Sequence, residues 1–228
     1  PAWSPDGREL AYVSFETRKA VIWVQDMASG TRRQVANYKG TNSAPAWSPD
    51  GRELAVTLSR DGGSQIFMMG RDGSNARRVS QGSAINTEAT FAPDGKTLYF
   101  VSDRGGSPQI YKQAVAGGNA ERVTFSGSYN ISPDISPDGR TLAFVQRQGG
   151  GAFKVMTMDL ASGNTQSVSD TSDDESPSFS PNGRFIIYAT RAQGRELLMT
   201  TTLDGRIKTR LLTSGLDIRE PVWGPFGR

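Results

Sequence analysis

The sequence repeats one ten-residue phrase at a fixed interval. The chain opens with PAWSPDGREL, and the same ten letters return at Pro45–Leu54. Looser copies follow at Ala89–Leu98 (ATFAPDGKTL), Pro133–Leu142 (PDISPDGRTL) and Pro177–Ile186 (PSFSPNGRFI), and a shorter one begins at Pro221 (PVWGPFGR). The starts at 1, 45, 89, 133, 177 and 221 are all 44 residues apart, so no insertion or deletion is visible between copies. A constant interval of this length indicates a repeat architecture.

Each repeat contains four short segments separated by turn residues. In residues 45–88, PAW leads into the turn Ser48–Gly51, and the segments ELAVTL, QIFMM and ARRVS follow, separated by RDGGS and GRDGSN. Proline at the second position of Ser48–Gly51 and glycine at the fourth favour a type I turn. No window between turns is long enough for a typical helix, so each repeat is predicted to be an antiparallel meander of four strands.

A four-stranded unit of this length is typical of a propeller blade, because it must stack on its neighbours to bury both faces. We therefore expect one all-β propeller domain over residues 1–228, with blades at 1–44, 45–88, 89–132, 133–176 and 177–220. Residues 221–228 add one inner strand, which predicts a six-bladed type whose sixth blade is incomplete, its other three strands preceding Pro1. A five-bladed ring with a stray C-terminal strand is the alternative.

The composition excludes several functions for this chain alone. It has no cysteine and no histidine, so it cannot form a disulfide, a Ser-His-Asp triad or a histidine metal site. The 26 basic and 23 acidic residues are scattered, which argues against nucleic-acid binding. No apolar run approaches the ~20 residues of a membrane span. The chain starts at Pro1 in register with a repeat, so we expect that an upstream segment was removed.

The residues just before each inner strand are the candidate partner-binding residues. Positions 44 apart are equivalent around the axis, so these residues should form a ring at one mouth of a central tunnel. The ring reads Asn42-Ser43-Ala44, Asn86-Thr87-Glu88, Asn130-Ile131-Ser132, Asp174-Glu175-Ser176 and Ile218-Arg219-Glu220. Asn and Asp at the first position also suit turns, because they hydrogen-bond nearby backbone. Glu88, Glu175, Arg219 and Glu220 differ between blades, which indicates a surface shaped for a partner.

Several carboxylates around one mouth raise two further hypotheses. A hard cation such as calcium could bind near Glu88, Glu175 and Glu220 through oxygen ligands. Like charges held close together would also raise one another's pKa, as in a general acid–base pair. Neither hypothesis has a signature beyond composition, so we expect no catalytic residue, no metal site and no cofactor, with weak calcium binding as the alternative.

Other repeated residues have structural explanations. Asp6, Asp50, Asp94 and Asp138 are each the third residue of a four-residue turn. The aromatic residues Trp3, Trp47, Phe91, Phe179 and Trp223 recur at one position, where they should pack blade against blade. The basic pairs fall in the fourth strand, whose exposed edge is protected from aggregation by charge.

The ordered set of repeats resembles the propeller of the TolB family. The matching pieces are PAWSPDG at Pro1–Gly7, NTE at Asn86–Glu88, DESPSFSPNG at Asp174–Gly183, TLDGRIKTRL at Thr202–Leu211 and PVWGP at Pro221–Pro225. They cover the whole chain in order and without gaps. The S-P-D-G turn by itself would be weak, since peptidase-associated propellers share it.

The resemblance implies a non-catalytic periplasmic protein of the Tol–Pal envelope system in Gram-negative bacteria, which supports outer-membrane integrity and constriction at division. Family members have an N-terminal α/β domain, absent from this sequence, before a six-bladed propeller. The peptidoglycan-associated lipoprotein (Pal) and colicin translocation segments bind at one mouth of the tunnel, whereas TolA is engaged through the upstream region. The implied partner-binding residues are Asn42, Ala44, Asn86, Thr87, Glu88, Asp174 and Glu175, and the ring adds Asn130, Arg219 and Glu220. Thr41 stands where some relatives carry a histidine.

Two other functions stay open at the level of sequence. A propeller that serves a serine peptidase would need a hydrolase domain with a G-x-S-x-G elbow, and the sequence shows none up to Arg228. A calcium-dependent lactonase-like propeller would use the central carboxylates, and its activity would be abolished by a chelator and by Glu88→Gln.

Overall fold

The described residues fold into five four-stranded sheets, and each sheet is one blade. The computed structural model describes residues 1–192, 194–211 and 218–225. Blade 1 is β1 (Ala2–Trp3), β2 (Glu9–Ser14), β3 (Val21–Asp26) and β4 (Arg32–Ala36); blade 2 is β5 (Asn42–Trp47), β6 (Glu53–Leu58), β7 (Gln65–Gly70) and β8 (Arg77–Arg78). Blade 3 is β9 (Asn86–Phe91), β10 (Thr97–Ser102), β11 (Gln109–Ala114) and β12 (Glu121–Arg122); blade 4 is β13 (Asn130–Ile135), β14 (Thr141–Arg147), β15 (Phe153–Asp159) and β16 (Thr165–Ser167). Blade 5 is β17 (Asp174–Phe179), β18 (Phe185–Ala192), β19 (Arg195–Thr202) and β20 (Lys208–Leu211).

Neighbouring strands in each blade are antiparallel and follow the order of the sequence. This arrangement confirms the predicted four-stranded meander. The 3-10 turn η1 (Gly149–Gly151) interrupts the hairpin between β14 and β15. No helix in the described part of the chain is long and apolar enough to cross a membrane.

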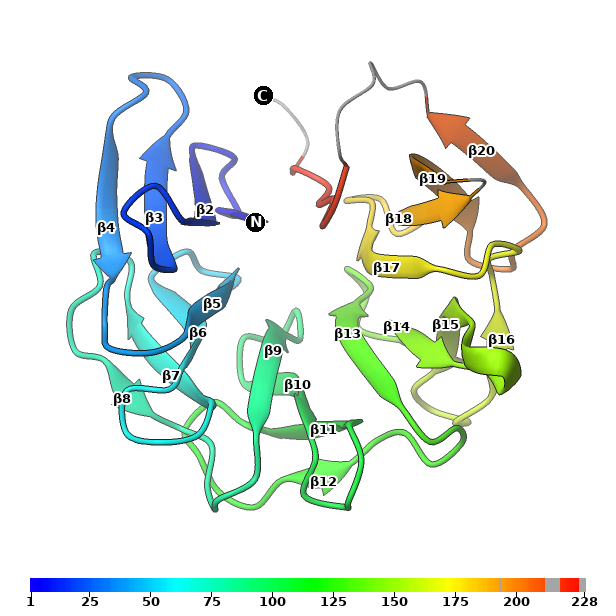
Figure 1. Cartoon of the computed structure of the whole chain (residues 1–228), viewed down its shortest axis with the longest axis horizontal. Helices are drawn as coiled ribbons and strands as arrows, with labels where there is room; N and C mark the ends of the chain where they lie inside the picture. The colour runs from blue at the N-terminus through cyan, green and yellow to red at the C-terminus, as the bar shows by residue number, and fades with distance from the viewer. Residues whose placement is uncertain (193, 212–217, 226–228) are drawn as a thin grey trace.

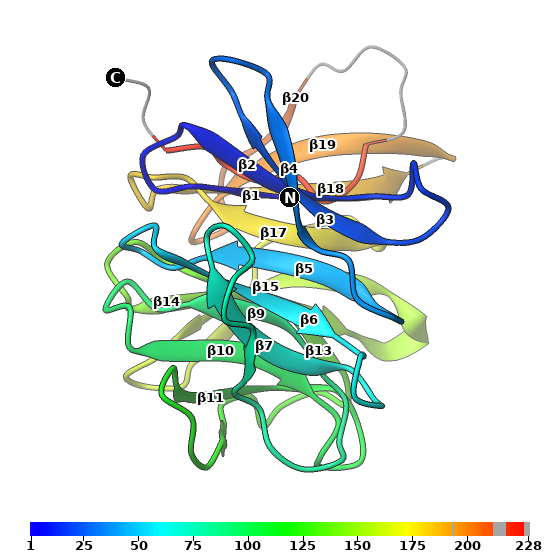
Figure 2. The ribbon, with the colours of Figure 1, turned by 90° about the vertical axis from the view of Figure 1, so that its left-hand side faces the viewer.

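The blades surround a central axis, with their first strands innermost (Figure 1). In the side view, blade 1 (blue), blade 2 (cyan) and blade 3 (green) follow one another downward (Figure 2). We call the end of the axis at which the inner strands begin the mouth face. Because each blade is a meander, the hairpins that join second and third strands lie at this same face, and the S-P-D-G turns lie at the opposite one.

Among the described residues, the hydrophobic core consists of four clusters, each between two consecutive blades. Ile22 and Val24 of blade 1, for example, pack in one cluster with Leu54, Phe67 and Met69 of blade 2. Strands β6, β7 and β10 are covered on both faces, so most of their residues are apolar instead of every second one. The core therefore forms only when blades stack, as expected for a repeat protein.

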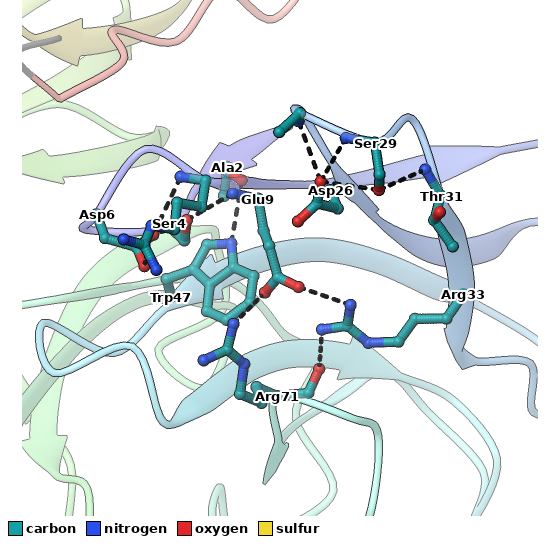
Figure 3. Close-up of polar contacts among 12 residues, drawn as sticks. Ala2, Ser4, Asp6, Glu9, Asp26, Ser29, Thr31, Arg33, Trp47 and Arg71 are labelled. Carbon is teal, nitrogen blue, oxygen red and sulfur yellow. Dashed lines mark hydrogen bonds and ion pairs between the residues drawn. The ribbon is translucent and has the colours of Figure 1, made fainter. Parts of the chain in front are cut away.

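The S-P-D-G turns hold their aspartates in local hydrogen bonds. Ser4 Oγ donates to Asp6 Oδ1 over 2.7 Å, and the Arg8 N–H donates to the same oxygen (Figure 3). The turns at Asp50 and Asp138 repeat this pattern. At Asp94 the carboxylate accepts instead from the N–H groups of residues 96 and 97. The structural role predicted for these four aspartates is confirmed.

Polar contacts join blade 1 to blade 2 beside the same turn. The Glu9 carboxylate accepts from Arg33 of its own blade and from Arg71 of blade 2, both over 2.7 Å (Figure 3). Burial acts to raise the pKa of Glu9, but the two guanidinium groups outweigh burial and lower it. Trp47 Nε1 donates to the Ala2 carbonyl over 3.1 Å, which confirms blade-to-blade packing for this aromatic residue.

The expectation of a six-bladed type is wrong for the described structure, which has five blades. Residues 221–225 form no strand, and residues 226–228 of the expected sixth inner strand lie outside the described residues. The Trp223 N–H donates to Ser178 Oγ of blade 5 over 3.3 Å, while Gly224 lies against the Trp3 ring and Pro225 against Gly7 of blade 1. The segment thus touches both blade 5 and blade 1, close to the start of the chain (Figure 1). It has no described second strand to pair with, so it makes no ladder.

Blade 4 contains an insertion and a deletion that the sequence interval hides. Val101 pairs with Ile110 in blade 3, whereas the equivalent Val145 pairs with Val155 in blade 4. The offset between blades is therefore 44 on the second strand and 45 on the third. One extra residue lies in the hairpin that contains η1, and one fewer lies between Ser169 and β17. The expectation of repeats without insertions is corrected for this blade.

Candidate partner-binding site

The first ring position holds Asn42, Asn86, Asn130 and Asp174, one at the start of each inner strand from β5 to β17. All four side chains are buried, with exposed fractions of 0%, 0%, 0% and 3%. The structure therefore leaves them no surface to offer a partner. Their burial favours a structural role, in line with the turn-forming tendency of Asn and Asp, and their role in partner binding stays a prediction.

These side chains join each inner strand to the preceding blade. In blade 2, Gln65 Oε1 accepts from Asn86 Nδ2 over 2.9 Å and from Ser80 Oγ over 2.7 Å, and Ser80 Oγ accepts from the Ile66 N–H. In blade 3, the same contacts recur with Gln109, Asn130, Thr124 and Ile110. Buried polar groups arranged in this way satisfy one another, so the network fixes how consecutive blades meet.

Blade 4 uses a carboxylate instead of the amide pair. Because of the one-residue offset, the position of Gln109 is occupied by Lys154, which offers no acceptor. Asp174 takes over this function, since it accepts from Ser169 Oγ, from Thr171 Oγ1 and from the Val155 N–H. The departure from asparagine in the fourth repeat thus has a local structural cause.

The third ring position has a left-handed backbone in every repeat. Ala44, Glu88, Ser132, Ser176 and Glu220 have φ between 47° and 53°. In blades 2 to 5, the ladder between the first and second strands shifts register at this point, which marks a β-bulge. Non-glycine residues in this region are strained, and such strain is concentrated at functional sites.

Glu88 connects two blades at this position. Its Oε2 accepts from the backbone N–H of Ser132 over 2.8 Å and from Ser132 Oγ over 3.0 Å. Burial raises the pKa of the Glu88 carboxyl, the two Ser132 donors lower it, and the Glu220 carboxylate raises it, with a net upward shift. Glu88 is thus held near the axis by the next blade and is only partly exposed.

The structure brings Glu220 within electrostatic reach of both Glu88 and Glu175. Burial raises the pKa of Glu175, Arg219 lowers it, and Glu220 and Glu196 raise it again, with a net upward shift. Arg219 donates to Glu196 Oε1 over 2.8 Å. Glu220 thus lies near both of the other carboxylates, and the three residues come from separate repeats.

This cluster does not form a metal-binding group in the described part of the chain. No three Asp or Glu side chains among those residues are placed to hold one ion. Calcium binding therefore stays a prediction without a structural argument of its own.

Thr87 completes the exposed part of the ring. Its hydroxyl lies 3.3 Å from that of Thr57 in blade 2, and its side chain is partly exposed. Ala44 is also partly exposed, and Arg219 and Glu220 are exposed. Apart from Ile218 of the last repeat, which is partly exposed, the ring members that present surface are those at the second and third positions.

Asp134 is a partly buried carboxylate that sequence reasoning missed. Its Oδ2 accepts from the Phe179 N–H of blade 5 over 2.7 Å, and its Oδ1 accepts from the Ile135 N–H. Burial raises the pKa of Asp134 to about 6, although these N–H groups and Ser178 act to lower it. A signal was available, because the equivalent positions in the other repeats hold Ala2, Ala46, Thr90, Ser178 and Val222, none of them charged.

Comparison with known proteins agrees with the propeller fold. The model of the family described as the TolB beta propeller domain matches residues 1–227. The Tol-Pal system protein TolB of Chromobacterium violaceum is 67% identical over 43 residues, and that of Hahella chejuensis is 64% identical over 44 residues. Each of these segments is 19% of this chain and 10% of the relative.

A solved structure extends the similarity to the whole chain. The crystal structure of TolB from Acinetobacter baumannii superposes with a TM-score of 0.93 at 44% sequence identity. The alignment covers 99% of this chain and 57% of that protein. The chain thus spans little more than half of the solved relative.

Proposed function

Because this chain belongs to the TolB β-propeller family, we propose that it is a non-catalytic docking module of the Tol–Pal system. Its partner is the peptidoglycan-associated lipoprotein, Pal, which binds at the mouth face around the axis. Colicin translocation segments use the same site. TolA is engaged only through the family's N-terminal region.

The observation that supports this proposal best is the ring of strained residues around the axis. The backbone conformation is the same in all five repeats, yet the side chains are Ala, Glu, Ser, Ser and Glu. A scaffold role explains the shared conformation but not the variation. Side chains that differ around a common frame suit an asymmetric partner, and complementary charges there would set specificity and encounter rate.

The proposal places Thr87 and Glu88 at the centre of the interface. Both are partly exposed, and they come from the same inner strand, β9. Glu220 lies within electrostatic reach of both Glu88 and Glu175, and these carboxylates add negative charge. Basic groups of the partner would pair with these carboxylates, and the Thr87 hydroxyl would hydrogen-bond its backbone.

Membership of the Tol–Pal system also supports a location. The relatives named above are Tol-Pal system proteins, which indicates the envelope of a Gram-negative bacterium. We place the protein in the periplasm, where it would support outer-membrane integrity and constriction at division. No observation on the described residues favours the peptidase-associated or lactonase-like alternatives.

A calorimetric titration with soluble Pal tests the proposed function. We expect saturable 1:1 binding to a chain whose folding is verified by a cooperative circular-dichroism melt. Thr87→Ala and Glu88→Gln should each weaken binding by about tenfold, the effect of losing one hydrogen bond to a charged or desolvated group.

The matched controls are Thr31→Ala and Glu121→Gln, which change the same residue types at exposed positions away from the mouth face. They should leave the dissociation constant unchanged. Absence of binding by the folded chain would contradict the proposed function. Equal weakening by the control variants would contradict the proposed place of the site.

A further inference from the structure

The contact between Glu88 and Ser132 shows how this fold holds a carboxylate. One carboxylate oxygen receives two hydrogen bonds from a single serine, from its N–H over 2.8 Å and from its hydroxyl over 3.0 Å. The N–H is available because the left-handed backbone at Ser132 lies in the bulge between the paired residues Ile131 and Asp134. We call a serine with these two donors at this ring position a carboxylate clamp.

Ser176 repeats this clamp one blade further on. Its φ is 52°, against 53° for Ser132, and each serine precedes a proline in a bulge of the first strand. The other three residues of the ring are Ala44, Glu88 and Glu220, which have no hydroxyl group. Only Ser132 and Ser176 therefore combine both donors.

The clamp at Ser176 has no carboxylate from the neighbouring blade. The residue equivalent to Glu88 is here Ser132 itself, whose side chain is too short to reach across. Among the described residues, no other blade supplies an acceptor to the N–H or the hydroxyl of Ser176. Ser176 is also partly exposed, so a ligand can approach it.

We propose that Ser176 is a binding site for a carboxylate, and that its occupant is an Asp or Glu side chain of the protein that docks at the mouth face. The identity of the occupant rests on the proposed docking function, whereas the chemistry of the clamp does not. A charged acceptor makes both hydrogen bonds stronger than a neutral one would.

Nearby charges determine how tightly a carboxylate binds there. Glu175 precedes Ser176 in the chain, and Glu196 and Glu220 lie within electrostatic reach of Glu175. Arg219, which donates to Glu196, is the positive group of this cluster. The negative groups weaken binding of a free anion. A carboxylate that is part of a docked partner is held at high effective concentration and binds despite them.

Backbone amide NMR of the isotopically labelled 228-residue chain, titrated with sodium acetate, tests the clamp directly. The Ser176 amide should shift in a saturable way, while the Ser132 amide, which already donates to Glu88, should not. Equal concentrations of acetamide and of sodium chloride are the controls for a neutral acceptor and for ionic strength. Neither should reproduce the shift.

Variants provide the internal comparison. Ser176→Ala removes the hydroxyl and should weaken acetate binding several-fold, and Ala44 shows that alanine adopts this backbone conformation. Glu88→Ala vacates the clamp at Ser132, so both serine amides should then respond to acetate. Glu88→Gln, which preserves the packing, serves if Glu88→Ala does not fold. A Ser176 amide that ignores acetate, or responds equally to acetamide, would overturn the proposal.

A second experiment tests whether a carboxylate of the docked partner occupies the clamp at Ser176. If Pal binds the wild-type chain, Ser176→Ala should weaken that binding by about tenfold, as expected for a lost hydrogen bond to a charged group. Unchanged affinity would refute a partner carboxylate at Ser176. If Pal does not bind at all, the docking function fails, but the acetate titration still decides whether the clamp exists.

Discussion

At the scale of single residues, the residues at the third ring position adopt a left-handed backbone conformation although none of them is glycine. The conformation costs an alanine or a glutamate roughly 1–2 kcal/mol relative to ordinary backbone. The bulges let the third ring residue turn its N–H out of the ladder, as the contact from Ser132 to Glu88 shows. The sequence carries no signal of this conformation, because Ala, Glu and Ser rarely adopt it. The left-handed backbone at the third ring position was therefore not predictable from the sequence, although the residues that occupy this position were.

Ala44→Gly should stabilise the protein. Glycine adopts φ near 47° without steric strain, so we expect the free energy of unfolding to rise by about 0.5–1 kcal/mol after the greater flexibility of unfolded glycine is counted. Urea unfolding measures this change. The matched control is Ala46→Gly in the same strand, which lacks the strained backbone and should lose about 0.5–1 kcal/mol. Equal effects of both substitutions would refute strain at Ala44.

Asp134 should make stability depend on pH. Its folded-state pKa of about 6 lies above the ordinary value of 3.8, so the native state binds a proton more readily than the unfolded state. The contribution of the Asp134 carboxyl to the free energy of unfolding therefore increases as pH falls from 7 through 6 toward 4. This contribution is lost again as pH rises. A shift of this size corresponds to at most about 3 kcal/mol.

The comparison of wild type with Asp134→Asn isolates this contribution. Asparagine can still accept from the Phe179 N–H, but it does not titrate. Urea unfolding at pH 7.5 and pH 5 should show a gain at the lower pH that is larger in the wild type than in the variant. The same change in both proteins would mean that the Asp134 carboxyl is not perturbed.

At the scale of strands and turns, blades are joined by close backbone contacts as well as by side chains. The turn between β7 and β8 places Gly73 so that a Cβ atom would lie 2.4 Å from the Val35 carbonyl oxygen of blade 1. The turn glycine Gly205 lies similarly against Val168 of blade 4. These contacts explain the glycines at 73 and 205, whereas Gly30 has no such neighbour.

Gly73→Ala should therefore be strongly destabilising. We expect a loss of about 2–4 kcal/mol, because the left-handed backbone and the clash with Val35 both act against alanine. Thermal or urea unfolding provides the measurement. Gly30→Ala is the control, since Gly30 has a similar φ of 71° but nothing within 4 Å of the added Cβ, and it should lose only about 1 kcal/mol. If the two losses matched, close blade contact would not matter at Gly73.

Strand content and pairing were largely predictable from the repeat, because turn residues mark every strand boundary. The insertion in blade 4 was not, because the missing residue before β17 restores the 44-residue interval. Asn42, Asn86 and Asn130 were expected at an exposed ring and are buried instead. The reason is that each amide meets the preceding blade, and such a contact between repeats cannot be read from one repeat alone.

At the scale of the whole molecule, five stacked blades hold the mouth residues of separate repeats around one axis. The number of complete blades could be predicted by counting repeats in the sequence. The position of residues 221–225 in the structure could not. These residues contact Trp3, Gly7 and Ser178 without forming a strand, so the last repeat joins blade 5 to blade 1. The proposed partner-binding site depends on this arrangement, because Glu220 comes from the last repeat and Glu88 from blade 3.

The central claim is that a partner docks at the mouth face, and site-specific photo-crosslinking to Pal tests it most directly. A photoreactive residue at Thr41, exposed just before β5, should crosslink to Pal, whereas the same residue at Ser29, in an exposed turn of the opposite face, should not. Crosslinking from Thr41 alone, lost on competition with unlabelled chain, is the predicted result. Crosslinking from Ser29 alone, or equally from both positions, would contradict docking at the mouth face.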